Sequence, residues 1–173
     1  MDECGAHLAH TRAYAYAPRH ERAVGRAPKN RGRVTTLIAS LTPTGMGPHR
    51  TVLGGTSKAV FLSYLREELA PTLTPGQVVI LDNLGAHRPK EVAAIIEERG
   101  ARVLYLPGYS PDFNPIELAF GTLKARLRQA GARTREALEA AITAALEAIT
   151  LDDAAACFAH CGFPLSTSPQ GQD

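Results

Sequence analysis

The sequence predicts an α/β fold, in which a mixed sheet containing parallel strands is covered by helices on both faces. Short apolar runs typical of strands alternate along the chain with longer segments whose apolar residues recur at helical spacing. The length of 173 residues, with 45% hydrophobic and 21% charged side chains, suits one domain with a substantial core. This composition excludes a coiled coil and a fibrous repeat, and no apolar run is long enough to span a membrane.

The first half of the chain supplies two strands and a helix after a loop-like N-terminal stretch. Residues 34–41 are rich in β-branched and apolar side chains, which predicts a buried strand. A turn at residues 42–45 leads to a weaker strand at 49–53. Ser57 is placed to open a helix that Pro71 closes.

The middle of the chain supplies a strand, a helix and a further strand. Residues 77–81 are almost entirely apolar, as expected of a strand covered on both faces. Pro89 suits the first position of the following helix, which ends at Gly100. Residues 102–106 form the next predicted strand.

The last third of the chain is predicted to be helical. A stiff loop at residues 107–114 leads into a helix at 115–130 that Gly131 ends. Two more helices are expected at residues 134–149 and 151–160. The polar residues 164–173 are expected to be disordered. The three cysteines favour a reducing compartment, and Cys157 and Cys161 are expected in the core of the last helix.

The net charge of +2 is unevenly distributed. Residues 12–33 carry seven cations and one acid, a local charge of +6, so the rest of the chain sums to −4. The segment also contains two prolines and two glycines and few large apolar side chains. It is therefore predicted to be a loop that faces a polyanion, although a solvated surface loop is the simpler alternative.

Two acids stand out as candidates for chemistry. Asp82 directly follows the apolar run at 77–81, and functional groups in α/β sheets gather at the carboxyl ends of strands. Glu117 opens the helix after the stiff loop and shares one helix face with Lys124 and Arg128, an arrangement suited to a metal ion beside a phosphate backbone. Each acid also has a structural alternative: Asp82 could cap the next loop, and Glu117 could form a capping box with Asn114 or belong to a solvated charged face.

Three stretches resemble a known family. Asp2-Glu-Cys-Gly5, Leu81-Asp82-Asn83 with Gly85-Ala86-His87, and Tyr109-Ser-Pro-Asp-Phe-Asn-Pro-Ile-Glu117 are similar to the catalytic domain of IS630-group insertion-sequence transposases, which are related to the Tc1/mariner superfamily. The resemblance implies an RNase H-like fold over residues 1–163. It also implies that Asp2, Asp82 and Glu117 form a three-acid site for two Mg²⁺ ions, which Mn²⁺ can replace.

The same resemblance implies a substrate and partners. The expected activity is cleavage of phosphodiester bonds and strand transfer at the ends of an insertion sequence. The protein is expected in the bacterial cytoplasm, associated with the nucleoid. No association with membranes is expected. A homodimer is expected, because related enzymes work as dimers on paired DNA ends. The DNA contacts are expected at Arg19, Arg22, Lys29, Arg31, Arg33, Asn83, His87, Lys124 and Arg128.

The resemblance also creates an expectation about the N-terminus. Family members place a strand before the first aspartate and helix-turn-helix domains further upstream, whereas this chain begins one residue before Asp2. We therefore expect an N-terminally truncated domain whose first strand is largely missing, with Asp2 on a fraying end and activity in isolation reduced. An upstream helix-turn-helix domain, or a separate protein product, would supply the DNA-recognition part. A structure-specific nuclease of the same fold and a non-enzymatic DNA-binding remnant are the alternatives.

Overall fold

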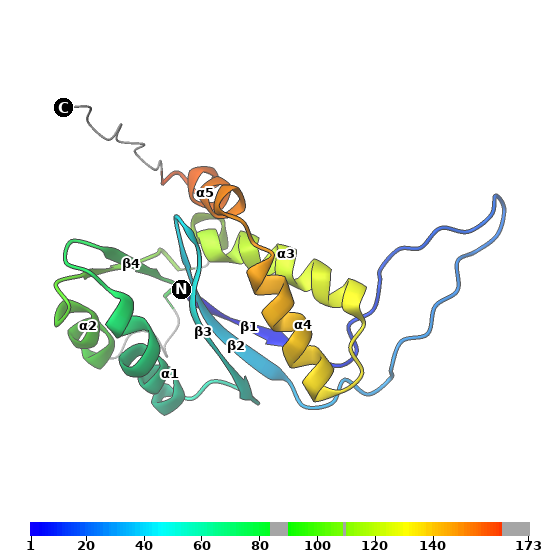
Figure 1. Cartoon of the computed structure of the whole chain (residues 1–173), viewed down its shortest axis with the longest axis horizontal. Coiled ribbons are helices and arrows are strands. Elements are labelled where there is room, and N and C mark those ends of the chain that lie inside the picture. Colours follow the sequence, from blue (N-terminus) through cyan, green and yellow to red (C-terminus); the bar gives the residue numbers. More distant parts are fainter. Residues whose placement is uncertain (84–89, 109, 164–173) are drawn as a thin grey trace.

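The fold, seen in a computed structural model that describes residues 1–83, 90–108 and 110–163, is built on two neighbouring sheets (Figure 1). An antiparallel sheet has the order β1-β2-β3, and a parallel pair, β4-β5, lies beside it. The strands are β1 (Asp2–Ala6), β2 (Thr35–Thr42), β3 (Gly45–Leu53), β4 (Val78–Leu81) and β5 (Arg102–Tyr105). The predicted mixed sheet flanked by helices is thus confirmed.

Strand β1 is ordered from its first residue. It pairs with β2 over its full length, from Asp2 opposite Ala39 to Ala6 opposite Thr35. The amino group of Met1 donates a hydrogen bond of 2.9 Å to the carbonyl oxygen of Ile80, which ties the start of β1 to β4. The expected fraying of Asp2 is therefore wrong, because β1 is formed from Asp2 to Ala6 and its pairing with β2 holds Asp2 in place.

The helices begin and end close to where the sequence predicts. Ser57 caps α1 (Lys58–Tyr64) by accepting a hydrogen bond from the backbone N–H of Val60, and α1 continues into a π-helical turn and a 3₁₀ turn that contains Pro71. Gly131 ends α3 with a left-handed φ of 57°. The remaining helices are α2 (Lys90–Glu97), α3 (Pro115–Ala130), α4 (Arg135–Glu147) and α5 (Leu151–His160). The expectation for Pro89 lies outside the described residues.

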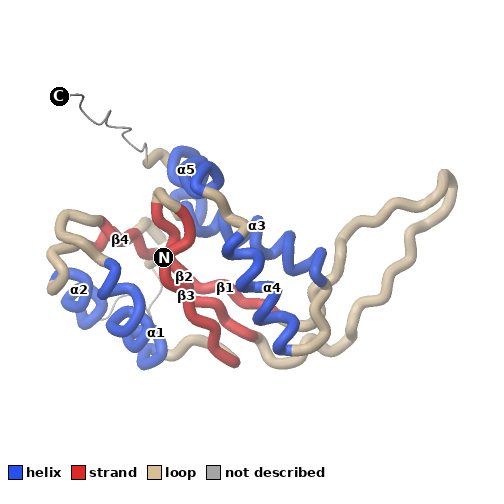
Figure 2. Tube along the Cα trace, viewed as in Figure 1, coloured by secondary structure: helices blue, strands red, loops and turns tan. Residues whose placement is uncertain are grey.

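Strand β2 is buried on both faces, which makes it the centre of the molecule. Ile38 packs into one hydrophobic cluster with residues of α1, α2 and β4, including Phe61 and Leu81. Its neighbour Leu37 packs into a second cluster with residues of α3 and α4, including Phe120. Because successive side chains of a strand point to opposite faces, helices cover both sides of the sheet (Figure 2).

The parallel pair is more exposed than predicted. Val79 and Leu81 of β4 are buried, whereas Val78 leaves 45% of its surface accessible, so the expected cover on both faces of residues 77–81 holds only in part. The physical reason is position: β4 and β5 lie beside the central sheet, so fewer helices pack over them than over β2 (Figure 1).

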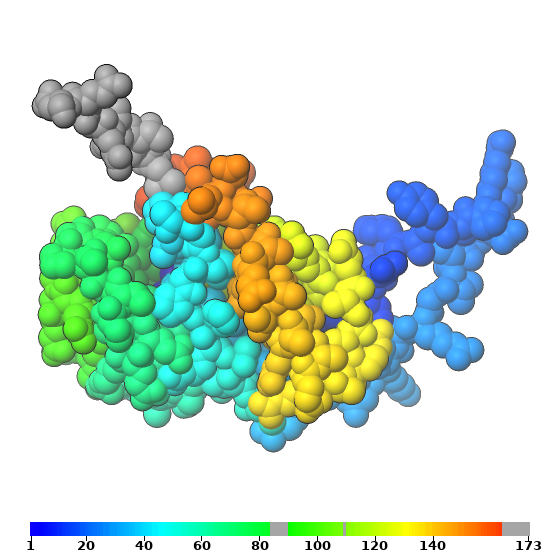
Figure 3. Space-filling model, viewed as in Figure 1, coloured from blue at the N-terminus to red at the C-terminus, as the bar shows by residue number. Residues whose placement is uncertain are grey.

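The basic N-terminal segment is a loop, as predicted. Residues 7–34 form no helix or strand, and from Glu21 to Val34 almost every residue is exposed. The segment runs out from the end of β1, turns back, and returns to β2, so that it projects from the body as a long arm (Figures 1 and 3). We call residues 11–30 the basic arm.

Two further sequence expectations concern the cysteines and the membrane. All three cysteines are free; Cys4 and Cys161 are buried and Cys157 is half-buried, in agreement with a place in or near the core. Within the described parts of the chain, every helix is too short or too polar to traverse a bilayer. The expected disordered tail at 164–173 lies outside the described residues.

Candidate active site

Asp2 is the most buried acid of the candidate site. It is the first residue of β1, and its side chain is 5% exposed. Its Oδ1 accepts a hydrogen bond of 2.7 Å from the backbone N–H of Glu3, and its Oδ2 accepts one of 2.8 Å from Nδ2 of Asn114. A carboxylate this far from water needs such donors, because burying an unpaired charge is costly.

The pKa of Asp2 is raised, mainly by burial. Burial raises the pKa of Asp2 from 3.8 to about 6, although the hydrogen bond from Glu3 opposes the change. The negative charges of Asp82 and Glu117 raise the pKa of Asp2 further. The contacts agree with a shared region of the fold, since Met1 bonds to Ile80, two residues before Asp82, and Asn114, three residues before Glu117, bonds to Asp2.

Each acid comes from a different element. Asp82 directly follows β4 and is half-buried, as the apolar run before it predicts. Glu117 lies in the first turn of α3 and is also half-buried. Because β1 is anchored to β4 through Met1, and α3 packs against β1 and β2, the tertiary fold fixes the relative positions of the three carboxylates.

Asn114 is a site residue that sequence reasoning missed. The capping-box alternative assigned its side chain to the start of α3, but no side-chain hydrogen bond caps this helix. Asn114 is 2% exposed, and its amide instead reaches Asp2, 112 positions earlier in the chain. The signal in the sequence was the rigid lead-in of Pro111 and Pro115, which is more than a simple cap requires.

Lys124 brings a positive charge to the same region. Burial raises the pKa of the Cys4 thiol, the ammonium group of Lys124 lowers it, and the charges of Glu117 and Asp2 raise it. Cys4 packs in the hydrophobic cluster that contains the inner side of α3, so the charge of Lys124 acts close to β1. This placement agrees with the predicted helix face on which Glu117 precedes Lys124 by about two turns.

The donor set suits a hard divalent cation. Mg²⁺ prefers carboxylate oxygens and keeps several waters, so three acids suffice to bind it. In the described parts of the chain, however, no group of three or more His, Cys, Asp or Glu side chains forms a ready metal cluster. Asp2, Asp82 and Glu117 therefore do not form such a group in this structure; a bound cation would favour the ionised form of Asp2, whose pKa is raised mainly by burial and further by the charges of Asp82 and Glu117.

The other predicted residues are divided between the acid site and the basic arm. Asn83 directly follows Asp82 at the end of β4, and Arg128 lies in the last turn of α3. His87 lies outside the described residues. The remaining predicted contacts are exposed on or beside the arm, away from the acids; these are Arg19, Arg22, Lys29, Arg31 and Arg33.

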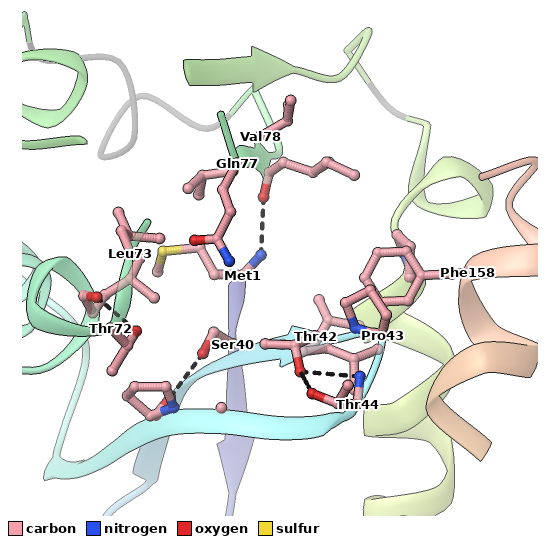
Figure 4. Close-up of a pocket in the computed structure, with 18 of the residues that line it drawn as sticks. Met1, Ser40, Thr42, Pro43, Thr44, Thr72, Leu73, Gln77, Val78 and Phe158 are labelled. Atoms are coloured by element: carbon pink, nitrogen blue, oxygen red, sulfur yellow. Dashed lines mark hydrogen bonds between the residues drawn. The ribbon is translucent and has the colours of Figure 1, made fainter. Parts of the chain in front are cut away.

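A cavity of about 610 Å³ opens beside Met1 (Figure 4). Met1 and Asn114 contribute to its wall, together with the ends of β2 and β4 and with Phe158 of α5. None of the three acids lines it. The cavity is therefore not formed by the acids, although Met1 and Asn114 next to them contribute to its wall.

The fold is an α/β domain in which Asp2, Asp82 and Glu117 lie at the start of β1, after β4 and in the first turn of α3. The chain belongs to the family of DDE superfamily endonucleases, whose sequence model matches residues 1–139. Comparison with curated protein sequences gives no match.

Solved structures share the fold. A Mos1 transposase paired-end complex with the left transposon end superposes with a TM-score of 0.67 at 20% identity, covering 94% of this chain and 55% of that one. The Mos1 mariner paired-end complex with Mn gives 0.67 at 19%, covering 94% and 51%. The isolated catalytic domain of Mos1 mariner transposase gives 0.51 at 17%, with 75% of each chain covered.

These likenesses confirm the predicted RNase H-like fold. The chain spans about half the length of the paired-end transposases it matches. The assignment to the IS630 group within the wider superfamily stays a prediction.

Proposed function

We propose that this chain is the catalytic domain of a DNA transposase that cleaves and transfers DNA strands at the ends of an insertion sequence. The observation that carries the proposal is the placement of Asp2, Asp82 and Glu117 at the start of β1, directly after β4 and in the first turn of α3 of an RNase H-like fold. Membership of the DDE endonuclease family and the fold of Mos1 transposase support it.

The three acids would hold divalent metal ions, with Mg²⁺ as the expected ion and Mn²⁺ as a substitute. Bound in a pair, such ions activate the attacking oxygen and stabilise the leaving oxygen of an in-line displacement at phosphorus. Solved Mos1 complexes with Mg and with Mn support this metal choice.

The surrounding residues prepare the acids for this role. Asn114 orients Asp2 by donating to Oδ2, while the N–H of Glu3 holds Oδ1. Lys124 supplies a positive charge beside the acids, suited to a phosphate of the bound strand. The exposed arginines of the basic arm offer further phosphate contacts.

The whole enzyme is proposed to act on DNA ends together with upstream helix-turn-helix domains, as a dimer, in the nucleoid region of a bacterial cytoplasm. Matched structures described as Mos1 complexes with transposon ends and with transferred strands support DNA as the substrate.

A nicking assay on supercoiled DNA that contains the element ends tests the proposal. A form of the protein with a strand and DNA-reading domain added upstream should nick DNA only with Mg²⁺ or Mn²⁺. The variants Asp82→Asn and Glu117→Gln should lose nicking, whereas Asp152→Asn, a matched change on the exposed face of α5, should retain it. Full activity of Asp82→Asn would overturn the metal site.

Thermal melting provides a readout that does not need activity. Mg²⁺ should raise the melting temperature of the chain, because a ligand bound by the folded state stabilises it, and Asp82→Asn should abolish the increase. DNA binding without any metal-dependent stabilisation would instead identify a non-enzymatic DNA-binding protein. Equal nicking of DNA without terminal repeats would identify a structure-specific nuclease.

A further inference from the structure

A pair of stacked histidines lies at the base of the basic arm, outside the acid site. The ring centroids of His7 and His10 are 4.2 Å apart, and the ring planes differ by 8°. Both side chains are half-buried, in the turn that leads from β1 into the arm. The proposed chemistry uses neither of them, so the pair needs an explanation of its own.

The turn that holds the pair also anchors the arm. Arg133, which follows α3, donates from Nη1 to the carbonyl oxygens of Leu8 and His10 at 3.0 and 2.8 Å. The N–H of Leu8 donates to the carbonyl oxygen of Arg31 at 3.2 Å, which joins the start of the arm to its end. Because residues 11–30 contribute nothing to the two hydrophobic clusters, these bonds hold the base of the arm against the body (Figure 1).

The hydrogen bonding of the pair requires neutral rings. Nδ1 of His7 accepts a hydrogen bond of 3.2 Å from the backbone N–H of Ala9, which is possible only while Nδ1 carries no proton. Nε2 of His10 is buried and has no hydrogen-bond partner among the described residues. The cation of His10 would carry a proton on this nitrogen, and a buried N–H without an acceptor is costly.

The charges around the pair also oppose protonation. Burial lowers the pKa of His10, and positive charges lower it further; these belong to His7, Arg128 and Lys124. Arg133 adds a guanidinium group at the backbone of the turn, while Arg31 at the end of the arm is exposed. The described charged groups that face the pair, from α3, from the segment after it and from the end of the arm, are thus cationic. A proton on either ring therefore adds repulsion.

We propose that His7 and His10 form a pH-sensitive latch at the base of the basic arm, closed while both rings are neutral and opened when either ring binds a proton. Protonation removes the bond from Ala9 or buries an N–H without an acceptor, and it places a positive charge beside Arg133. The turn then opens and the arm is free to change direction, while the sheets and helices keep their packing. The inference is independent of the proposed function, since it concerns neither the acids nor DNA.

Acidification should open the latch. The pKa of His10 in the closed turn lies below its ordinary value of 6.5, so its contribution to closure is present above that pH and is lost as the pH falls through the lowered value. Amide hydrogen exchange of the whole chain, read by NMR and corrected for the intrinsic rate, measures the protection of the Leu8 N–H between about pH 8 and about pH 5. This protection should fall several-fold. Protection of the backbone of β2 should not fall, which distinguishes local opening from unfolding.

A matched pair of variants separates the latch from general effects of acid. His10→Phe keeps an aromatic ring for the stack but cannot bind a proton, so Leu8 should stay protected down to about pH 5. His160→Phe, the same change at an exposed position in the last turn of α5, should behave as the wild type does. In the wild type, the ring signals of His10 should titrate with a midpoint below 6.5 that coincides with the loss of Leu8 protection.

Four results would overturn the latch. Protection of Leu8 that does not change with pH in the wild type would show that the turn stays closed. An equal fall in His10→Phe would assign the effect to another group, and a parallel loss of protection in β2 would show unfolding of the whole domain. If His10→Phe leaves Leu8 unprotected at every pH, the wild-type titration decides, and a His10 midpoint that differs from the midpoint of Leu8 protection excludes the latch.

Discussion

Asp2 and Asn114 form the pair of residues on which the acid site depends. The carboxylate is buried at the first position of β1, and the amide that stabilises it begins the approach to α3. The hydrogen bond between them therefore links two elements that carry acids. It also keeps one oxygen of Asp2 paired in a region with little water.

The substitution Asn114→Ala should destabilise the protein. It leaves Oδ2 of Asp2 without this buried donor, and a lost hydrogen bond of this kind costs about 1–3 kcal/mol. Urea denaturation measures the change in the free energy of unfolding. Asn30→Ala, which removes an exposed hydrogen bond to the backbone of Gly32, is the control and should cost less than about 0.5 kcal/mol. Equal losses in both variants would contradict a special role for Asn114.

The raised pKa of Asp2 predicts how stability depends on pH. Between 3.8, its ordinary value, and about 6, the folded protein holds a proton on Asp2 that the unfolded chain has released. The stability contributed by this protonated group is complete below about pH 4 and is lost as the pH rises through about 6. Asp2→Asn, which cannot ionise, should remove this fall when melting is measured in EDTA across that range. Identical pH profiles for the variant and the wild type would show that Asp2 does not titrate in this way.

At the scale of elements, α3 carries charged candidate residues in both its first and its last turn. Its first turn carries Glu117 and its last turn carries Arg128, while Phe120 and Leu123 on its inner side pack into the core. The helix therefore forms part of the core and carries Glu117 and Arg128 near its opposite ends. Its exact end matters, because Gly131 begins the turn that leads to Arg133.

Alanine substitutions at the glycine inside α3 and at the glycine that ends it should change the stability of the protein in opposite directions. Gly131→Ala forces a side chain into a left-handed conformation at φ 57° and should destabilise the protein by about 1 kcal/mol. Gly121→Ala, inside the same helix, places its new methyl group where no atom lies within 4 Å. It should stabilise the protein by up to about 1 kcal/mol, because alanine favours the helix. Urea denaturation of both variants checks the pair, and a loss of stability in Gly121→Ala would contradict the helical assignment.

At the scale of the whole molecule, the body and the basic arm are separable. The arm adds exposed backbone and charge, while the two hydrophobic clusters lie in the sheets and helices. The base of the arm is held by the bonds of Arg133 to Leu8 and His10 and by the N–H of Leu8 donating to Arg31. The sequence and length of the arm can therefore be changed without altering the packing of the core.

Replacing residues 11–30 with a short Gly–Ser linker should leave the melting temperature within a few degrees of the wild type. The physical reason is that shortening an exposed loop changes its closure entropy only slightly, by about 0.6 kcal/mol for each halving of its length. The same variant should lose most of its metal-independent affinity for duplex DNA. Thermal denaturation and anisotropy check the two expectations, and a large drop in melting temperature would show that the arm supports the fold.

Most of the elements could be predicted from local sequence. The strands β2 and β4, the cap at Ser57 and the end of α3 at Gly131 all follow from residue preferences that act within a few positions. Strand β1 could not be predicted this way, since five residues at a chain end have little local preference. Its order comes from pairing with β2 and from the bond of Met1 to Ile80, both of which need distant segments.

Some features of the candidate site could likewise be predicted from local sequence, whereas others depend on the tertiary fold. The sequence by itself determined the α/β class and the basic character of residues 12–33, and it indicated Asp82 and Glu117 as candidate acids, because composition, periodicity and short motifs are local properties. Asp2 became a candidate only through the family resemblance. Only the tertiary structure decided that Asp2 is buried and ordered, that Asn114 serves Asp2 rather than its own helix, and that the arm and α3 share a cleft lined with arginines. These features depend on contacts between residues up to 112 positions apart, and such contacts exist only once the chain has folded.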